Sequence, residues 1–427
     1  MPLPGGVNVY NKGYTSPAVE FLEEEMIPEH NPQVENVYGI IGFSSDGPYE
    51  PTVITSISEL HKRFGNSTDD EGAFYKAVAT AERVLKYTSK IIFCRVEVGI
   101  DGESSKVVND GIAFGYFENT EAVDVSVLVA PYGEEYAKLL YTTPETVTDE
   151  VKWTAYMAKY TEINKKLIAV AEKRSDCVVI LDYPEGTTYE RFTKGIIEDE
   201  TYSSLDNDQC ITYFPTVNIV DPYTGTIYEA PASSTGLRAM AYTDSKDYCW
   251  YAPAGYGNNR GVISDAVSCN AVLTKEERDA LYEKKVNPIV QFVGKGTVIM
   301  GNTTFKNRST SATSPDSLYC QIGVRRLANY IKKAVVSISL ETLFEPNDPL
   351  TWAQWKNRVE PILNEIKANR GVEDFKVKMD RTTITDEDIS NNRAPGIIYV
   401  KPIGAIEFIS IRYVVTQDDT YFVEEEE

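Results

Sequence analysis

The sequence predicts a layered α/β core domain followed by a C-terminal α+β domain, with extended arms at both ends of the chain. Three observations support this fold class. Apolar strands alternate with helices between residues 34 and 186, as is typical of a sheet buried between helical layers. A hairpin and two amphipathic helices occupy residues 287–371. The first 20 residues are rich in proline and glycine, and the last 21 begin with the alternation of a strand.

The formal charge of the 427 residues is −22, and it is unevenly distributed. Residues 287–427 contain 17 Lys and Arg against 19 Asp and Glu, so residues 1–286 account for −20. A strongly acidic segment is best exposed to solvent, whereas a nearly neutral one can pack against copies of itself. We therefore predict four parts: an N-terminal arm at 1–20, an acidic, outward-facing α/β part at 21–286, a C-terminal domain at 287–405, and an arm strand with an acidic tail at 406–427.

Most elements of the α/β part follow from hydrophobic periodicity. Strands are predicted at 34–45, 51–60, 90–98, 123–133 and 177–186. Helices are predicted at 69–87, where Phe74, Ala77, Val78, Ala81 and Leu85 recur at helical spacing, and at 151–174. The polar stretch near 99–122 is expected to form a small insertion. A DPYTG turn predicts paired strands within 211–233, and a capping box at 274–277 begins a short helix that continues to Lys285.

The C-terminal domain is expected to begin with a hairpin at 287–305 and a helix at 324–337. One face of this helix is apolar, with Val324, Leu327, Ile331 and Val335. The opposite face is basic, with Arg325, Arg326, Lys332 and Lys333. A basic face can bind nucleic acid or another anion. In a chain with a charge of −22, we favour salt bridges from these four residues to an acidic neighbouring subunit.

A second helix is predicted at 350–371, where Gly371 is a natural end. Pro361 is expected to kink it or to begin a second helix. Its apolar side consists of Trp352, Trp355, Val359, Ile362, Leu363 and Ile366. Its polar side, with Lys356, Arg358, Glu365 and Lys367, requires a partner or water. Beyond it, Ile409, Ile411, Tyr413 and Val415 alternate as in a half-buried strand.

Several classes of function are disfavoured. The only histidines are His30 and His61, and no CxxC motif exists, so we predict no catalytic triad, no metal site, no redox motif and no cofactor. The cysteine usage fits synthesis in a reducing, intracellular compartment. The acidic balance argues against direct nucleic-acid contact, and no apolar run suggests a membrane span or a secretory signal. The best catalytic candidate is Asp182 at a strand end, as in a soluble α/β hydrolase, but a capping role there is the more common one.

The order of several phrases resembles that of contractile tail sheath proteins of myovirus-type bacteriophages and related contractile injection particles. The phrases are CVVILDYPEG at 177–186, YFPTVNIVDPYTG at 213–225, VNPIVQFVGKGTVIMG at 286–301, VRRLANYIKKAV at 324–335 and LFEPNDPLTW at 343–352. A P-x-x-x-IEFI-x-I strand at 402–411 follows them. The resemblance extends over most of the chain and is strongest from about 211 to 412.

The resemblance implies a non-enzymatic subunit that stacks as hexameric rings, in a six-start helix, around an inner tail tube. Contraction of this polymer would drive the tube through the target cell envelope for genome delivery. The arms, about Pro2–Val19 and Ile406–Val423, would add strands to neighbouring subunits through Val7, Val9, Tyr10, Phe408, Ile409, Ile411, Tyr413 and Val415. The C-terminal domain would face the tube through Lys356, Arg358, Glu365 and Lys367.

The further partners implied are baseplate and tail terminator proteins, and the implied location is the virion tail sheath, assembled in the host cytoplasm. Two alternatives stay open beside the hydrolase. One is the sheath of a headless bacteriocin-like or extracellular contractile injection particle. The other is a different virion or surface shell protein that also polymerises.

Overall fold

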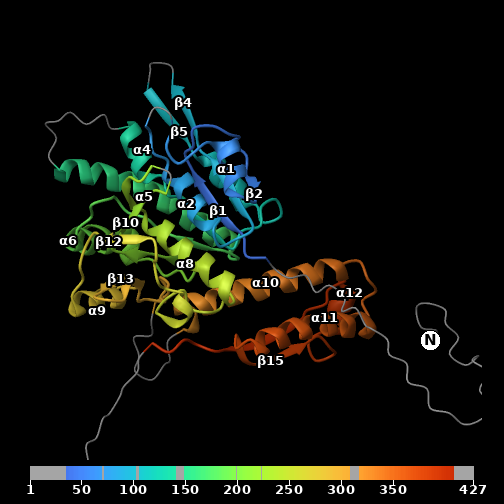
Figure 1. The fold of residues 1–427 in the computed structure, drawn as a ribbon. Coiled ribbons are helices and arrows are strands. Elements are labelled where there is room, and N and C mark those ends of the chain that lie inside the picture. The colour runs from blue at the N-terminus through green and yellow to red at the C-terminus, as the bar shows by residue number, and fades with distance from the viewer. Residues whose placement is uncertain are drawn as a thin grey trace, which may run out of the picture. The chain divides into compact units, whose positions relative to one another are not determined.

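The computed structural model describes residues 35–69, 72–101, 105–140, 149–198, 200–222, 224–307 and 317–407. Its largest element is a six-stranded sheet with the order β2-β3-β1-β6-β7-β8 (Figure 1). All neighbouring strands in it are parallel except β2 and β3. The strands are β1 (Tyr38–Gly42), β2 (Thr52–Ile54), β3 (Ile91–Arg95), β6 (Val127–Val129), β7 (Val178–Ile180) and β8 (Cys210–Ile211).

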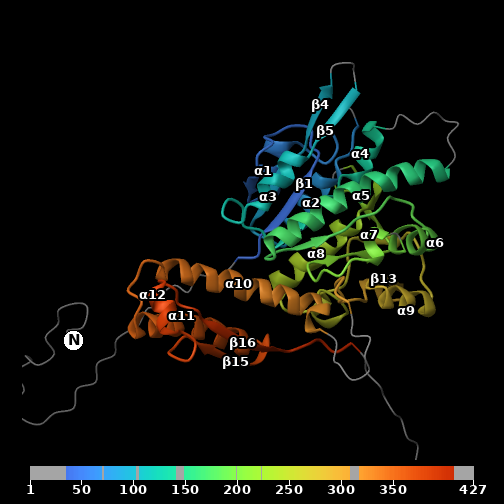
Figure 2. The same cartoon turned by 180° about the vertical axis from the view of Figure 1, so that it is seen from behind.

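Helices cover both faces of this sheet, so the predicted layered α/β class is confirmed (Figures 1 and 2). Helices α2 (Lys76–Val84) and α8 (Ala232–Lys246) pack together on one face. Helices α3 (Gly111–Glu118) and α5 (Asp149–Arg174) pack together on the other. At Gly42 of β1, an added Cβ would lie 2.2 Å from the Cβ of Ala77 in α2. Only glycine permits this close approach of helix and sheet.

Smaller elements surround the sheet. They include α1 (Ile57–Phe64), the hairpin β4 (Glu97–Asp101) and β5 (Ser105–Asn109), α4 (Gly133–Leu140), α6 (Tyr189–Phe192), η2 (Thr193–Ile197) and α7 (Glu200–Ser203). A three-stranded sheet has the order β11 (Ile227–Ala230), β10 (Val217–Val220), β12 (Ala266–Cys269). Another has the order β14 (Gly296–Ile299), β13 (Asn287–Phe292), β9 (Tyr213–Phe214). Two short helices are η3 (Gly257–Asn259) and α9 (Lys275–Glu283), and α9 begins at the predicted capping box on Thr274.

Two predicted elements differ from the structure. The strand predicted at 51–60 is β2 followed by α1, because the Ser56 side chain accepts the Glu59 N–H and caps a helix there. The helix predicted at 69–87 is shortened to α2, because Asp69 accepts the Ala73 N–H and Thr68 pairs with Phe74 before it. In both places a local side-chain hydrogen bond outweighs the hydrophobic pattern.

The region near 99–122, predicted to be a small insertion, contains the β4–β5 hairpin and then α3. Helix α3 belongs to the main core, because Phe114 and Phe117 are buried against the sheet.

A second core includes Cys249 and Trp250, which follow α8, and side chains of the C-terminal elements. These elements are η4 (Leu318–Cys320), α10 (Ile322–Thr342), α11 (Pro349–Ala368), β15 (Val372–Lys378), α12 (Asp386–Ser390) and β16 (Ile397–Pro402). Trp355, Val359 and Leu363 of α11 are buried in it, on the predicted apolar face. Helix α11 continues through Pro361, which lies on the exposed face, where solvent can satisfy the carbonyl that proline leaves unpaired.

The predicted domain boundary before residue 287 lies inside the packing of the first core. Strand β13 pairs in parallel with β9, and Ile289, Ile299 and Ile322 are buried with the main sheet. Within α10, the side chains of the second core begin at Leu327.

Candidate functional site

Helix α10 connects the two cores. Ile322 near its N-terminus is buried in the first core, and Ala334 and Ile338 near its C-terminus are buried in the second. The Trp355 indole N–H of α11 donates to the Ser339 hydroxyl at 3.0 Å, which joins α11 to the same helix. Helix α10 is therefore a structural link between the C-terminal domain and the α/β domain.

A buried ion pair holds the first half of α10. Arg326 is 3% exposed, and its Nη2 donates to Asp244 Oδ2 of α8 at 2.5 Å. The same carboxylate accepts the Tyr38 hydroxyl of β1 at 2.5 Å. Burial, and next the charge of Asp244, raise the pKa of Tyr38 well above its ordinary value. These three side chains join α10, α8 and the main sheet at one point.

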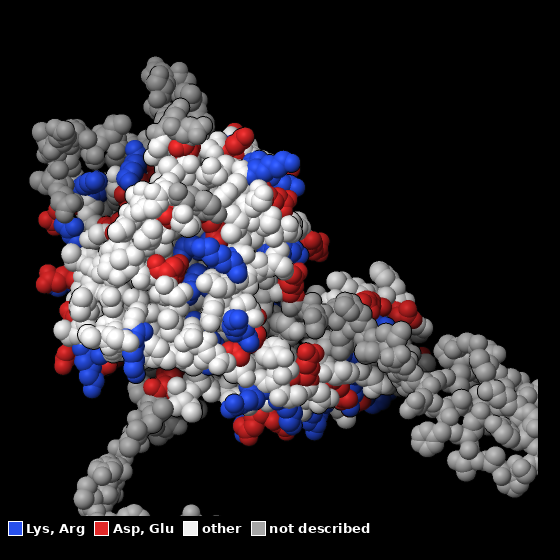
Figure 3. Space-filling model, viewed as in Figure 1, with Lys and Arg blue, Asp and Glu red and all other residues white. Residues whose placement is uncertain are grey.

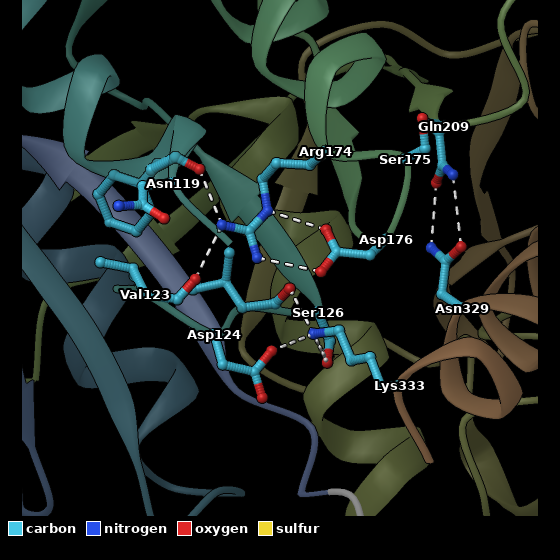
Figure 4. A network of polar contacts seen from close by, with 12 residues as sticks. Asn119, Val123, Asp124, Ser126, Arg174, Ser175, Asp176, Gln209, Asn329 and Lys333 are labelled. Carbon is cyan, nitrogen blue, oxygen red and sulfur yellow. Dashed lines mark hydrogen bonds and ion pairs between the residues drawn. The ribbon is translucent and has the colours of Figure 1, made fainter. Parts of the chain in front are cut away.

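Two lysines further along α10, Lys332 and Lys333, donate to loops beside the main sheet. Figure 4 shows the contacts of Lys333. Lys333 Nζ donates to Asp124 at 2.5 Å and to the Val125 carbonyl at 2.7 Å. Lys332 Nζ donates to the Ser175 and Arg174 carbonyls at 3.1 and 3.4 Å, just after the C-terminus of α5. A cation is favoured at a helix C-terminus because the exposed carbonyls carry partial negative charge.

The loops that receive these lysines are themselves tied together by Arg174 (Figure 4). Its buried guanidinium donates to Asp176 at 2.9 Å and to the Val123 carbonyl at 2.8 Å. Beside it, the side-chain amides of Gln209 and Asn329 exchange hydrogen bonds of 3.3 and 3.0 Å. Arg325 Nη1 donates to Asp208 at 3.1 Å. The contact of α10 with the α/β domain is therefore made by polar groups, which can all pair only when the helix lies at one position along its axis.

The four basic residues predicted to pair with a neighbouring subunit thus all have partners in their own chain. Arg325, Arg326 and Lys333 form ion pairs, and Lys332 donates to carbonyl oxygens. Their predicted role between subunits stays a prediction. The acidic partners Asp208, Asp244 and Asp124 were missed, because they lie 82 to 209 residues away in the chain.

The polar face of α11 is exposed, as predicted. Lys356, Arg358 and Lys367 form ion pairs of 3.4, 2.9 and 2.8 Å with Glu360, Glu341 and Asp374. Glu365 is exposed on the same face. Figure 3 shows acidic and basic side chains alternating along this part of the C-terminal domain. Such pairs are solvent-screened, so each is worth about 0–1 kcal/mol and can be exchanged for other partners.

Strands β15 and β16 form a two-stranded sheet beside α11. Within the described residues neither strand has a second neighbour, so each has an unpaired edge. Tyr399 and Ile397 of β16 are 51% and 40% exposed. An exposed, partly apolar strand edge is a template for another strand. The predicted arm residues, Val7, Val9 and Tyr10 and those from Phe408 to Val415, lie outside the described residues.

The carboxylate of Asp182 has a structural role. It is 5% exposed, and its carboxylate accepts the N–H of Ser233 at 2.7 Å and the Ser233 hydroxyl, in the first turn of α8. Burial raises the pKa of Asp182 to about 6, against the effect of the Ser233 hydrogen bonds. His61 bonds Glu82 at 2.7 Å and is not part of this contact. Asp182 therefore bonds the first turn of a helix that is distant in the chain, whereas the structural role predicted for it was to cap the turn after its own strand.

Among the residues that the structure describes, no group of three or more His, Cys, Asp or Glu side chains could hold a metal ion. In the same part of the chain, no helix is long and apolar enough to cross a membrane.

Family models match most of the chain. Residues 113–305 match the phage tail sheath protein central domain, and residues 314–416 match the phage tail sheath C-terminal domain. The tail sheath protein of Vibrio phage KVP40 is 30% identical over 67% of this chain and 44% of that protein. The tail sheath protein of Enterobacteria phage T4 is 25% identical over 92% of this chain and 58% of that protein. The chain spans about half the length of the curated relatives it matches.

Solved structures share the fold. The helical sheath of the anti-feeding prophage (AFP) in its contracted state has a TM-score of 0.64, with 17% identity over 95% of this chain and 100% of that chain. The sheath complex of PVC, an extracellular contractile injection system, in its contracted state has a TM-score of 0.61, with 16% identity over 95% and 99%.

Replacing Arg326 with alanine tests the anchor of α10. The change leaves Asp244 buried without its cation, so we expect the free energy of unfolding to fall by about 3–5 kcal/mol. Urea denaturation of the monomer measures this. Arg358→Ala is the control, because its exposed pair with Glu341 contributes about 0–1 kcal/mol. Equal effects of the two substitutions would contradict a buried anchor.

Replacing Asp182 with asparagine tests its environment. Its pKa is raised from 3.8 to about 6, so the folded chain binds this proton more readily than the unfolded chain. Proton binding to Asp182 therefore stabilises the folded chain fully below about pH 4. This stabilisation, roughly 3 kcal/mol in all, is lost as the pH rises through about 6. The free energy of unfolding, relative to that of D182N, should fall by this amount between about pH 4 and pH 7. A difference independent of pH would contradict the raised pKa.

Proposed function

The chain belongs to the phage tail sheath family, and from this premise we propose that it is the structural subunit of a contractile tail sheath. Its copies stack as hexameric rings around an inner tube, and their contraction drives the tube through the target cell envelope for genome delivery. The work is mechanical and needs no catalytic residue. The observation that carries the proposal is the sheet of β15 and β16, whose two outer edges are unpaired within the described residues.

Strand addition explains how such a polymer stays connected while its subunits move. A terminal arm of a neighbouring subunit adds to a free edge of the β15–β16 sheet by main-chain hydrogen bonds. The described chain ends near its own α10, where Glu407 accepts from Tyr282 at 2.6 Å and from Gln321 at 3.2 Å. The C-terminal arm therefore starts from a fixed point. An extended arm of about 18 residues spans roughly 60 Å, which allows rigid subunits to slide and rotate while they stay linked.

Rigid docking of α10 supports the same function. Contraction moves subunits as rigid bodies, so the domain that carries the C-terminal arm must transmit force to the rest of the subunit. The Arg326–Asp244 pair and the Lys332 and Lys333 contacts provide that connection.

The inner tube is the proposed partner of the exposed face of α11, through Lys356, Arg358, Glu365 and Lys367. Weak, screened charge pairs suit a contact that must break when contraction is triggered. Baseplate and tail terminator proteins are the proposed partners at the two ends of the polymer, and the proposed location is the virion tail, assembled in the host cytoplasm.

A headless contractile injection particle is the second candidate, favoured by the likeness of the fold to the AFP and PVC sheaths. Particles purified from the producing cells separate the two, because a phage tail is joined to a DNA-filled head and a headless device is not.

Deletion of residues 2–19, or of residues 408–427, should abolish polymerisation, because each deletion removes the strand that a neighbour would receive. Negative-stain microscopy should show hollow striated cylinders for the full chain and none for either deletion. Circular dichroism and urea denaturation should show a folded monomer in all three. Cylinders of normal length from both deletions would contradict strand addition.

Charge reversal at Lys356 and Arg358 to glutamate should weaken co-assembly with the inner tube protein by at least tenfold in the concentration required. The matched control is Lys62→Glu with Arg63→Glu, an equal charge change on exposed α1. Co-sedimentation of sheath and tube at low and high salt measures the effect. Unchanged co-assembly of the α11 variant would assign the tube contact to another surface.

A further inference from the structure

The turn between α10 and α11 presents an aromatic side chain to solvent. Phe344 is fully exposed and has a φ of 70°, a conformation that residues other than glycine seldom adopt. The apolar side chains of Leu340, Leu343 and Leu350 around it in the sequence are also more than half exposed. Apolar groups that gather at an exposed turn mark an interaction site.

The turn is held in place by hydrogen bonds on its far side. Asn347 accepts the Trp352 indole N–H at 2.8 Å and donates to the Arg393 carbonyl at 3.1 Å. Asp348 caps α11 by accepting the Thr351 N–H at 2.8 Å. These hydrogen bonds fix the backbone of the turn that carries Phe344. Little conformational freedom is therefore lost when a partner buries this side chain. The next residue, Glu345, is exposed and has no side-chain partner among the described residues.

A hollow of about 340 Å³ lies on the α/β domain, between α2 and the β10–β11 hairpin. Ile219, Val220, Pro222 and Tyr228 form its apolar wall. Val220 is 42% exposed, and Ile227, its partner across the hairpin, is 59% exposed. The mouth of the hollow is thus apolar and open to solvent.

The other wall of the hollow is polar and contains Arg83, Lys86, Glu82 and Asp265. Arg83 is 4% exposed; its Nε donates to Asp265 at 2.9 Å and its Nη1 to Ser234 at 2.8 Å. Its Nη2 is buried and has no hydrogen-bond partner within the described part of the chain. A buried donor without a partner is costly, so a ligand that supplies an acceptor is favoured here.

Asp265 lies between Arg83 and Arg238, whose Nε is 3.6 Å from the other carboxylate oxygen. Lys86, which also lines the hollow, is exposed. The other acid of the hollow, Glu82, bonds His61. Figure 3 shows basic side chains beside an acidic group on this face, near the place of α8 in Figure 1. The unpartnered Arg83 Nη2 and the exposed Lys86 are donors that a carboxylate next to an apolar group would match.

We infer that Phe344 and Glu345 of one subunit dock into this hollow on a second copy. The ring enters the apolar wall, and the carboxylate accepts from Arg83 Nη2 and from Lys86. Within one chain neither feature is satisfied, because Phe344 is fully exposed and Arg83 Nη2 lacks a partner among the described residues. A contact between two different surfaces of identical subunits is head-to-tail and propagates into an open helix. The inference rests on the proposed polymeric function.

Cysteine cross-linking identifies the occupant. One preparation carries Glu345→Cys and a second carries Lys86→Cys, and the two are assembled together under mild oxidation, in the extended and the contracted polymer. We expect a disulfide dimer that contains one copy of each variant, in at least one of the two states. The wild-type chain, in which five cysteines are buried and Cys269 is partly buried, gives the background. Cross-linking of the Glu345→Cys variant only to the tube protein, or only within its own chain, would overturn the inference.

Substitution tests the energetics of the contact. Phe344→Ala should raise the protein concentration needed for polymerisation at least tenfold, whereas Phe344→Leu should retain most of the assembly. Val293→Ala is the matched control, because Val293 is equally exposed on the β13–β14 turn. All of these side chains are on the surface, so a folded monomer is expected. Equal polymerisation of the alanine variant at Phe344 and the wild type would contradict the inference.

A charge exchange tests the pairing itself. Glu345→Lys and Lys86→Glu should each weaken polymerisation, and the double variant should recover at least half of the loss. Failure of the double variant to recover would show that the two side chains do not meet. Suppose that the wild type polymerises, that the arm deletions do not, and that every Phe344, Glu345 and Lys86 variant polymerises like the wild type. That result would overturn this inference alone. Absence of any polymer from the wild type would overturn the proposed function.

Discussion

The burial of positive charge along α10 is the constraint on which the arrangement of the two cores depends. Arg326 is shielded from water, so its charge requires Asp244, and Asp244 in turn satisfies the hydroxyl of Tyr38. Lys332 and Lys333 find carbonyls and a carboxylate further along the helix. An apolar contact tolerates sliding, whereas these bonds are satisfied only in one register. The polar contacts therefore make α10 a stiff link.

Stiffness in the subunit and looseness between subunits are complementary requirements for a contractile polymer. The second core is small and carries the proposed contact surfaces on its outside: a two-stranded sheet with edges unpaired among the described residues, a helix face of screened ion pairs and an apolar turn at Phe344. Each suits a different kind of contact. Strand pairing is directional and persistent, exposed ion pairs exchange readily, and a buried aromatic ring adds affinity without long reach.

Much of the fold was predictable because the buried strands are runs of apolar residues and because α10 and α11 each have one apolar face. The predictions failed where a short side-chain hydrogen bond decides the backbone, as at Ser56 before α1 and at Asp69 before α2. The exposed face of α11 was predicted from Lys356 and Arg358, since an amphipathic pattern shows which side faces solvent. The partners of the basic face of α10 could not be predicted, because they come from distant parts of the chain.

The order of apolar and polar residues, by itself, determined that this chain forms a buried α/β sheet with an amphipathic C-terminal pair of helices, since the periods of strand and helix are local properties. The tertiary structure alone decided which charged side chains are buried and which are exposed to solvent. Arg326 and Arg358 look alike in the sequence, yet one is locked against Asp244 and the other is exposed beside Glu341. Burial depends on what the rest of the chain places nearby, and no local pattern contains that information.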